Sequence, residues 1–269
     1  MQNGSVSAHS RPNIILVTAD QHRFNCLGAA GHSVVKTPNL DTLASRGTLF
    51  ERAYAAAMPC GPARASIMTG HYEATHGQHS NHDVMTPPDR TALPELLADA
   101  EYDTALVGKL HLKPFDRSYG FRHFIRHDAP YTNYLADEAY ESQYVKDLAD
   151  AQFRGDTEKV IQLFTEDESS QHTDEMRFML GSDFVELEQH EAAWAIRRSI
   201  EYLSEDRVPG NPFFLNIGFY GPHQPYLCPA PYSTMYPADQ LELPEEFFYE
   251  TGDKPILQRS GKRNSVVRR

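Results

Sequence analysis

The sequence predicts an α/β protein with a mostly parallel central sheet. Three apolar runs indicate buried strands, at residues 13–19, 104–107 and 212–220. Segments with helical patterns separate the runs, and polar side chains follow each run within a few residues. Because an open α/β sheet binds its ligands at the carboxyl ends of the strands, those polar residues are the candidate functional site.

Composition limits the classes of function. A chain of 269 residues is long enough for one large α/β domain or two small ones. Its 25 Lys and Arg against 37 Asp and Glu give a net charge of −12, which argues against a nucleic-acid or anionic-membrane partner. The amino terminus lacks signal-peptide features, no run approaches a transmembrane length, and three widely spaced cysteines make no disulfide framework. We expect a cytoplasmic protein.

The first apolar run, residues 13–19, is β-branched and suits a strand buried on both faces of the sheet. It ends at Asp20 and Gln21. Asp20 is a hard oxygen ligand of the kind that Ca²⁺ or Mg²⁺ takes, and Gln21 can add an amide oxygen. The alternative is that Asp20 only caps the segment that follows.

Residues 37–47 predict a turn and a short helix with Leu40 and Leu43 facing inward, closed by Gly47. Residues 49–54 are a plausible strand leading to Cys60. Further along, residues 93–100 fit a helix with Pro94 in its first turn.

The residues around Cys60 predict the start of a helix. Pro59 suits a bend and Pro62 a first helical turn, so Cys60 lies at or just before a helix amino terminus, which favours anions and activated nucleophiles. Arg64 follows one turn later on the same face. We expect both side chains to point into one pocket. The alternative is a small buried cysteine beside an ordinary helix start.

Two other segments carry candidate polar groups. Lys109 and His111, two residues apart in a segment expected to be extended, would project to one face and suit a sulfuryl or phosphoryl group. A helix is expected over residues 182–205, and His223 follows the third strand. A zinc cluster in the loop after Gly70 is a weaker alternative. The histidines of that loop are His71, His76, His79 and His82.

These motifs resemble the type I, formylglycine-dependent sulfatases of the alkaline phosphatase superfamily, near the arylsulfatase and phosphonate monoester hydrolase branch. Cys60-x-Pro62-x-Arg64 with the later Thr-Gly resembles the modification signature, although Ala63 stands where family members usually carry Ser or Thr. The Thr-Pro-Asn-Leu-Asp helix, Gly-Lys-x-His and Pro-His-x-Pro segments are similar as well. The resemblance covers residues 12 to about 250.

The resemblance implies a three-layer α/β/α fold and a set of roles. Cys60 would be oxidised to formylglycine by a maturation enzyme, and a divalent metal, Ca²⁺ with Mg²⁺ or Mn²⁺ as alternatives, would be bound. The implied metal ligands are Asp20, Gln21 and Cys60; the implied catalytic residues are Cys60, Arg64, Lys109, His111 and His223; and the implied substrate-binding residues are Lys109, His223 and Asn81.

The expected function is hydrolysis of a small sulfate ester. Phosphonate monoester or phosphodiester hydrolysis is the alternative within the superfamily, although Lys109 and His111 favour sulfate. A third alternative is an inactive, truncated fragment, because a later Asp-His or Asp-Asn pair that completes the family's metal site is missing. The alcohol half of the substrate and the oligomeric state stay open.

We expect a disordered lead-in at residues 1–11 and a catalytic domain at 12–250. Residues 125–183 would form a variable insertion that shapes substrate access. Residues 251–269 form a basic tail, where the truncation would lie.

Overall fold

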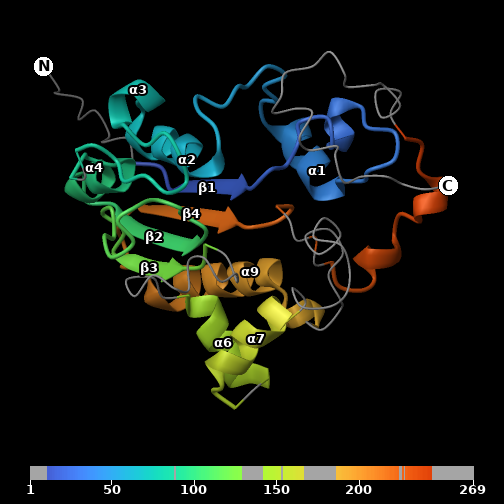
Figure 1. The fold of residues 1–269 in the computed structure, drawn as a ribbon. Helices are drawn as coiled ribbons and strands as arrows, with labels where there is room; N and C mark the ends of the chain where they lie inside the picture. The colour runs from blue at the N-terminus through green and yellow to red at the C-terminus, as the bar shows by residue number, and fades with distance from the viewer. Residues whose placement is uncertain are drawn as a thin grey trace, which may run out of the picture.

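The computed structural model describes residues 11–87, 89–128, 142–152, 154–166, 186–223, 226 and 228–243. Their four strands form one parallel sheet in the order β1-β4-β2-β3 (Figure 1). Because all four strands run in one direction, their carboxyl ends lie at the same edge. The predicted parallel α/β sheet is confirmed. The strands are β1 (Ile14–Ala19), β2 (Asp103–Gly108), β3 (His123–Arg126) and β4 (Phe213–Phe219).

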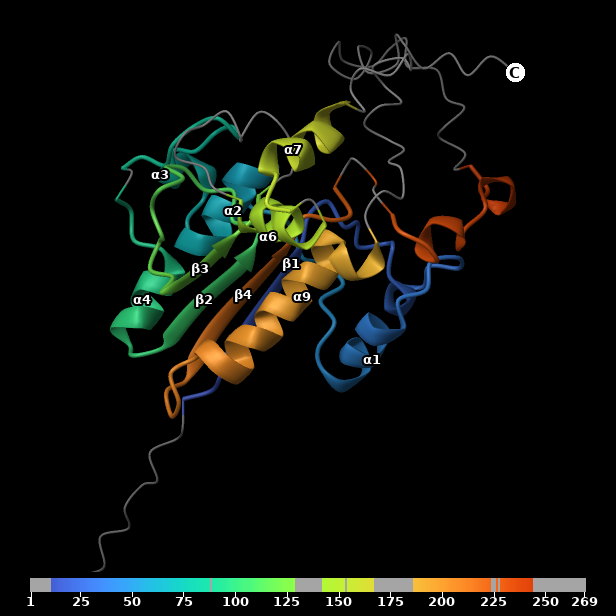
Figure 2. The ribbon, with the colours of Figure 1, turned by 90° about the horizontal axis from the view of Figure 1, so that it is seen from below.

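Helices cover the sheet on two sides and make three layers (Figures 1 and 2). One layer contains α2 (Cys60–Thr69), α3 (Glu73–His76) and α4 (Leu93–Asp99). The opposite layer contains α6 (Gln143–Gln152), α7 (Thr157–Glu166) and α9 (Glu191–Glu201).

Each layer is held to the sheet by its own apolar core. On the α2 side, Met68 packs in one cluster with Leu106 and Phe214 of the sheet. On the α9 side, Trp194 belongs to a second cluster that includes Leu215. Successive residues of a strand point to opposite faces, so β2 and β4 contribute side chains to both cores. Both strands are buried along nearly their whole length, as predicted.

The helix expected over residues 182–205 begins later than predicted. In the described residues α9 starts at Glu191, where the His190 ring accepts a hydrogen bond from the Ala192 amide, and it continues into a π-helix over Tyr202–Asp206. Within α9, Ile200 is 58% exposed, whereas Trp194 is buried. Residues 182–185 lie outside the described part.

Two burial predictions near the amino terminus are wrong. Strand β1 is at the edge of the sheet, and α9 does not extend over it, so Ile15 and Val17 are 52% and 56% exposed instead of buried. The expected helix forms as α1 (Pro38–Arg46), near the carboxyl end of β1 (Figure 1). Its Leu40 and Leu43 are also exposed, because no described element covers them.

Other differences concern elements that lacked a clear pattern. Residues 49–54 form no strand; their side chains are all exposed, and no described strand pairs with them. Strand β3 was not predicted, and it pairs with β2. The expected insertion at 125–183 contains the end of β3 and helices α6 and α7, while its residues 129–141, 153 and 167–183 lie outside the described part.

Candidate active site

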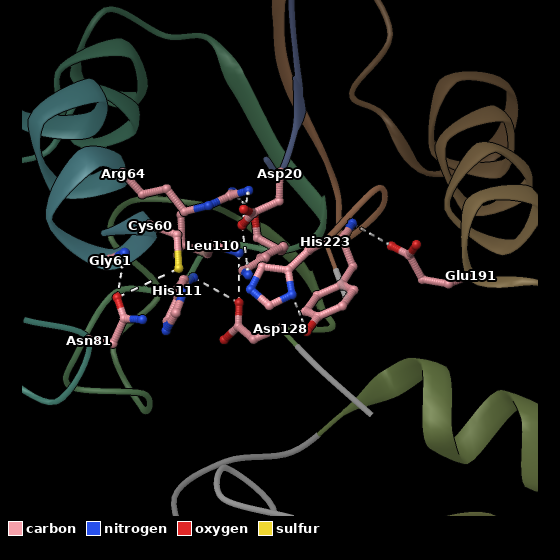
Figure 3. A network of polar contacts seen from close by, with 12 residues as sticks. Asp20, Cys60, Gly61, Arg64, Asn81, Leu110, His111, Asp128, Glu191 and His223 are labelled. Carbon is pink, nitrogen blue, oxygen red and sulfur yellow. Dashed lines mark hydrogen bonds and ion pairs between the residues drawn. The ribbon is translucent and has the colours of Figure 1, made fainter. Parts of the chain in front are cut away.

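The predicted polar residues converge at the carboxyl edge of the sheet. Asp20 follows β1, Lys109 follows β2, and His223 lies just beyond β4. Helix α2 points its amino terminus at the same place, and Cys60 is its first residue. Figure 3 shows the side chains of Asp20, Cys60, Arg64 and His223 gathered at this place.

Asp20 is the electrostatic centre of the site. One of its carboxylate oxygens, Oδ2, lies 2.7 Å from Lys109 Nζ and 3.3 Å from an Arg64 guanidinium nitrogen, and all three side chains are buried. Burial raises the pKa of Asp20, but the charges of Lys109 and Arg64 outweigh burial and hold that pKa below its usual value. Arg64 also donates to the Lys109 carbonyl at 2.7 Å. The network fixes two cations around one carboxylate.

Cys60 is half-buried and contacts Asn81. Its sulfur lies 3.6 Å from Asn81 Oδ1, and the same oxygen accepts a hydrogen bond from the Gly61 amide at 2.9 Å. Gly61 leaves little room there, since a Cβ at this position would lie 2.7 Å from the Gln78 amide nitrogen. Asn81, expected to contact substrate, therefore contacts the candidate nucleophile in this structure.

Lys109 and His111 reach the site by a bent backbone, not by the extended segment predicted from their spacing. Gly108 has φ of 94° and His111 has φ of 57°, both in the left-handed region. His111 is 2% exposed. Burial first, and then the charge of Lys109, lower the pKa of His111 to about 3. The ring of His111 is therefore neutral at neutral pH.

Sequence reasoning missed Tyr220, which links the two sides of the site. Its hydroxyl lies 2.8 Å from His223 Nδ1, and Lys109 Nζ lies 4.5 Å from the centre of its ring. The Tyr220 amide donates to Glu191 Oε1 at 2.9 Å (Figure 3). In the sequence, Tyr220 looked like the last residue of an apolar strand. It lies three residues before His223, and this short distance in sequence was the signal that could have indicated their contact. Glu191 had no signal in sequence.

Among the described residues, one group of three could hold a metal ion. The ligand atoms of Asp20, Cys60 and His223 all lie within 4.8 Å of one another. Gln21 follows Asp20 with φ of 61° and an exposed side chain, so its role as a ligand stays a prediction. The zinc cluster considered for the histidine loop is not among the groups found in the described residues; His76, for example, is 3.0 Å from Ser66 Oγ.

Comparison with known proteins gives one family. The family model described as Sulfatase matches residues 12–264. An arylsulfatase of Clostridium perfringens is 30% identical over 265 residues, which are 96% of this chain and 52% of that protein. The multifunctional alkaline phosphatase superfamily protein PehA of Trinickia caryophylli is 29% identical, with 87% and 46% covered. The chain therefore spans about half the length of these curated relatives.

Solved structures give the same fold. The crystal structure of the phosphonate monoester hydrolase of Agrobacterium radiobacter aligns with a TM-score of 0.65 and 26% identity, over 87% of this chain and 45% of that chain. Separately, the described helices of this protein are too short or too polar to cross a bilayer.

Proposed function

Because this chain belongs to the sulfatase family, we propose that its site hydrolyses sulfate esters by means of a formylglycine formed from Cys60. The observation that carries the proposal is the convergence of Asp20, Arg64 and Lys109 on one side of the Cys60 position. A tetrahedral anion needs fixed positive charge beside the nucleophile, and this cluster provides it. Hydrated formylglycine would supply an oxygen nucleophile for the sulfur atom, and later loss of sulfate would restore the aldehyde.

Arg64 and Lys109 serve different parts of the reaction in this proposal. Lys109 Nζ is a compact charge that stabilises the nonbridging oxygens of the sulfuryl group. Arg64 fixes the positions of Asp20 and Lys109 relative to each other, because its guanidinium group binds both the Asp20 carboxylate and the Lys109 carbonyl. Asn81 orients the residue at position 60 through Oδ1. The sequence led us to expect that Asn81 contacts the substrate; in this proposal it contacts the nucleophile instead.

His223 is the better candidate for proton transfer to the leaving alcohol. His111 is neutral at neutral pH because its pKa is lowered to about 3, so its ring serves as a hydrogen-bond partner of the sulfuryl group. The Tyr220 hydroxyl lies 2.8 Å from His223 Nδ1, a contact that orients the His223 ring at the site.

Asp20 offers a carboxylate oxygen to a divalent cation, Ca²⁺ in our proposal, with Mg²⁺ and Mn²⁺ as alternatives. The thiol of Cys60 is a soft ligand, but its oxidised form would present oxygen, which fits a hard cation. Gln21 is the further proposed ligand. Such a cation would supply Lewis-acid stabilisation of negative charge. A maturation enzyme in the cytoplasm, acting on Cys60, completes the proposal.

The test is the variant Cys60→Ala assayed with 4-nitrophenyl sulfate. We expect turnover to vanish while the circular dichroism spectrum and the melting temperature stay close to those of the wild type. Cys26→Ala, which removes another half-buried free cysteine, is the matched control and should keep full activity. The mass of the tryptic peptide 53–64 from the native host would show whether position 60 is an aldehyde. Unchanged turnover in Cys60→Ala contradicts the proposal.

Phosphonate monoester hydrolysis is the second candidate. The likeness to the Agrobacterium radiobacter hydrolase supports it. Lys109 and His111 together favour the sulfate ester, because phosphonate hydrolases carry uncharged groups at the matching positions. The ratio of kcat/KM on an aryl sulfate to that on an aryl phosphonate separates the two candidates.

A third candidate is a chain that binds anions without turning them over. The chain spans about half the length of its relatives, and the described site offers Ca²⁺ few of the about six to eight oxygens it takes. Calorimetric titration with Ca²⁺ tests this candidate: weak binding together with absent turnover would favour it over the hydrolase.

A further inference from the structure

The loop that carries Lys109 and His111 is bent in a way that needs an outside support. Gly108 and His111 both have left-handed φ values, and His111 is not a glycine. A non-glycine residue in this region costs on the order of 1 kcal/mol or more unless its surroundings hold it there. Something must therefore stabilise the bend.

Asp128 provides that support. Its Oδ1 accepts hydrogen bonds from the Leu110 and His111 amides, each at 2.7 Å (Figure 3). Strands β2 and β3 are parallel neighbours, so Asp128, two residues after β3, lies beside the end of β2. The side chain of Asp128 is fully buried, and a carboxylate accepting two successive amides fixes their direction.

Arg126 completes the support from the other side. Its guanidinium group pairs with Asp128 Oδ2 and is 4% exposed. It also donates to the Phe115 carbonyl at 2.8 Å and to the Leu112 carbonyl at 3.2 Å. The ion pair therefore binds two amides and two carbonyls of the segment 110–115.

Asp128 is ionised at neutral pH, opposite the positive charge of Arg126. Burial raises the pKa of Asp128, but Arg126 foremost, with His111 next, lowers it to about 2. The buried charges compensate each other, and each makes further hydrogen bonds to backbone, which is the condition under which a buried pair is tolerated.

We propose that the Arg126–Asp128 pair positions Lys109 and His111 for catalysis, by fixing the backbone that carries both side chains. This inference rests on the proposed function for its catalytic consequence, but the positioning itself can be tested without turnover. Asp128 is a positioning residue, because its carboxylate binds the backbone amides of Leu110 and His111. Its loss should move Lys109 Nζ away from the 2.7 Å contact with Asp20.

The test uses the full chain with three variants. Asp128→Asn keeps an acceptor but removes the charge. Arg126→Gln combined with Asp128→Asn removes both charges, so no unpaired charge stays buried. Asp103→Asn is the matched control. Asp103 is a buried carboxylate at the amino end of β2, the strand that precedes Lys109, and it accepts a hydrogen bond from the Val208 amide at 2.8 Å.

We expect both Asp128 variants to lower kcat on 4-nitrophenyl sulfate by about 10²-fold. Their affinity for inorganic sulfate, measured by calorimetry, should weaken by about tenfold. Asp103→Asn should lose stability while keeping kcat and sulfate affinity within about twofold of the wild type. An effect on Asp103→Asn as large as that on Asp128→Asn would reduce the pair to a general structural role and overturn the proposal.

Amide hydrogen exchange on the wild-type protein tests the contact itself. The Leu110 and His111 amides should exchange much more slowly than the exposed loop amides of residues 51–56. Fast exchange at both positions overturns the proposal, whether or not the variants fold. If the wild type shows no turnover but these amides are protected and sulfate affinity falls in the variants, the proposed hydrolysis fails and the positioning role stands.

Discussion

Asn81 contacts Cys60, a contact that the sequence did not predict. Its Oδ1 lies beside the Gly61 amide and the Cys60 sulfur, so in our proposal it orients the candidate nucleophile. We therefore expect Asn81→Ala to lower kcat by up to about 10²-fold with little change in KM.

Steady-state kinetics on 4-nitrophenyl sulfate separates the two roles of Asn81. The exposed Asn39, on α1, provides the control variant Asn39→Ala, which should match the wild type. A raised KM with unchanged kcat would instead favour the substrate contact expected from the sequence.

Glu191 gives the protein a pH-dependent stability. Burial raises its pKa to about 7, although hydrogen bonds from the Tyr220 and Gly221 amides lower it. Between pH 4.5 and about 7 the folded state therefore binds more protons than the unfolded state, and stability falls as pH rises. The loss is on the order of 3 kcal/mol and levels off above pH 7.

Glu191→Gln should remove most of this dependence, because Gln keeps an acceptor for the Tyr220 amide and carries no charge. We expect the variant to match the wild type near pH 5 and to exceed its stability at pH 8, as measured by urea unfolding. Glu188→Gln, at an exposed position nearby, should keep the wild-type slope. A wild-type slope in Glu191→Gln would show that another group is responsible.

At the scale of elements, the ends of β2 and β4 approach each other closely where the site begins. The Lys109 amide donates to the Gly218 carbonyl at 2.7 Å. A Cβ on Gly218 would lie 2.1 Å from the Lys109 carbonyl oxygen, a backbone atom that cannot move aside alone. Glycine at 218 thus lets β4 run beside the bend that carries Lys109.

Gly218→Ala should therefore destabilise the fold by about 3 kcal/mol, as measured by chemical unfolding. Gly221→Ala is the control, since a Cβ at 221 would meet no atom within 4 Å, and it should change stability by less than about 1 kcal/mol. Equal stabilities for the two variants would mean that the two strands separate at little cost.

At the scale of the whole molecule, one apolar surface has no cover among the described residues. It consists of the exposed face of β1 and the facing side of α1, around a cavity of about 700 Å³ that Val17, Leu40, Leu43 and Phe219 help to line. Contiguous apolar surface of this kind favours association. We expect the chain to self-associate as its concentration rises.

Sedimentation velocity over a concentration series checks this expectation. The double variant Ile15→Thr/Val17→Thr should reduce association with little loss of stability, because both side chains are more than half exposed and Thr suits a strand. Ile200→Gln, at an exposed position on α9, is the control and should associate like the wild type. A monomeric wild type at all concentrations would contradict the expectation.

The sequence by itself determined the parallel α/β sheet, the strands β1, β2 and β4, and the polar residues that follow them. These are local signals: an apolar run predicts a buried strand, and a parallel sheet brings the strand ends to one edge. The motif around Cys60 likewise placed the helix start at the residue where α2 begins.

Only the tertiary structure decided what those residues contact. Strand β1 is an edge strand, so its apolar run did not imply burial on both faces. Asp128 and Glu191 accept hydrogen bonds from amides that are at least 17 residues away in the sequence, and no local pattern records such a contact. Burial and neighbouring charge likewise set the pKa of His111, because a pKa depends on three-dimensional surroundings and not on residue type alone.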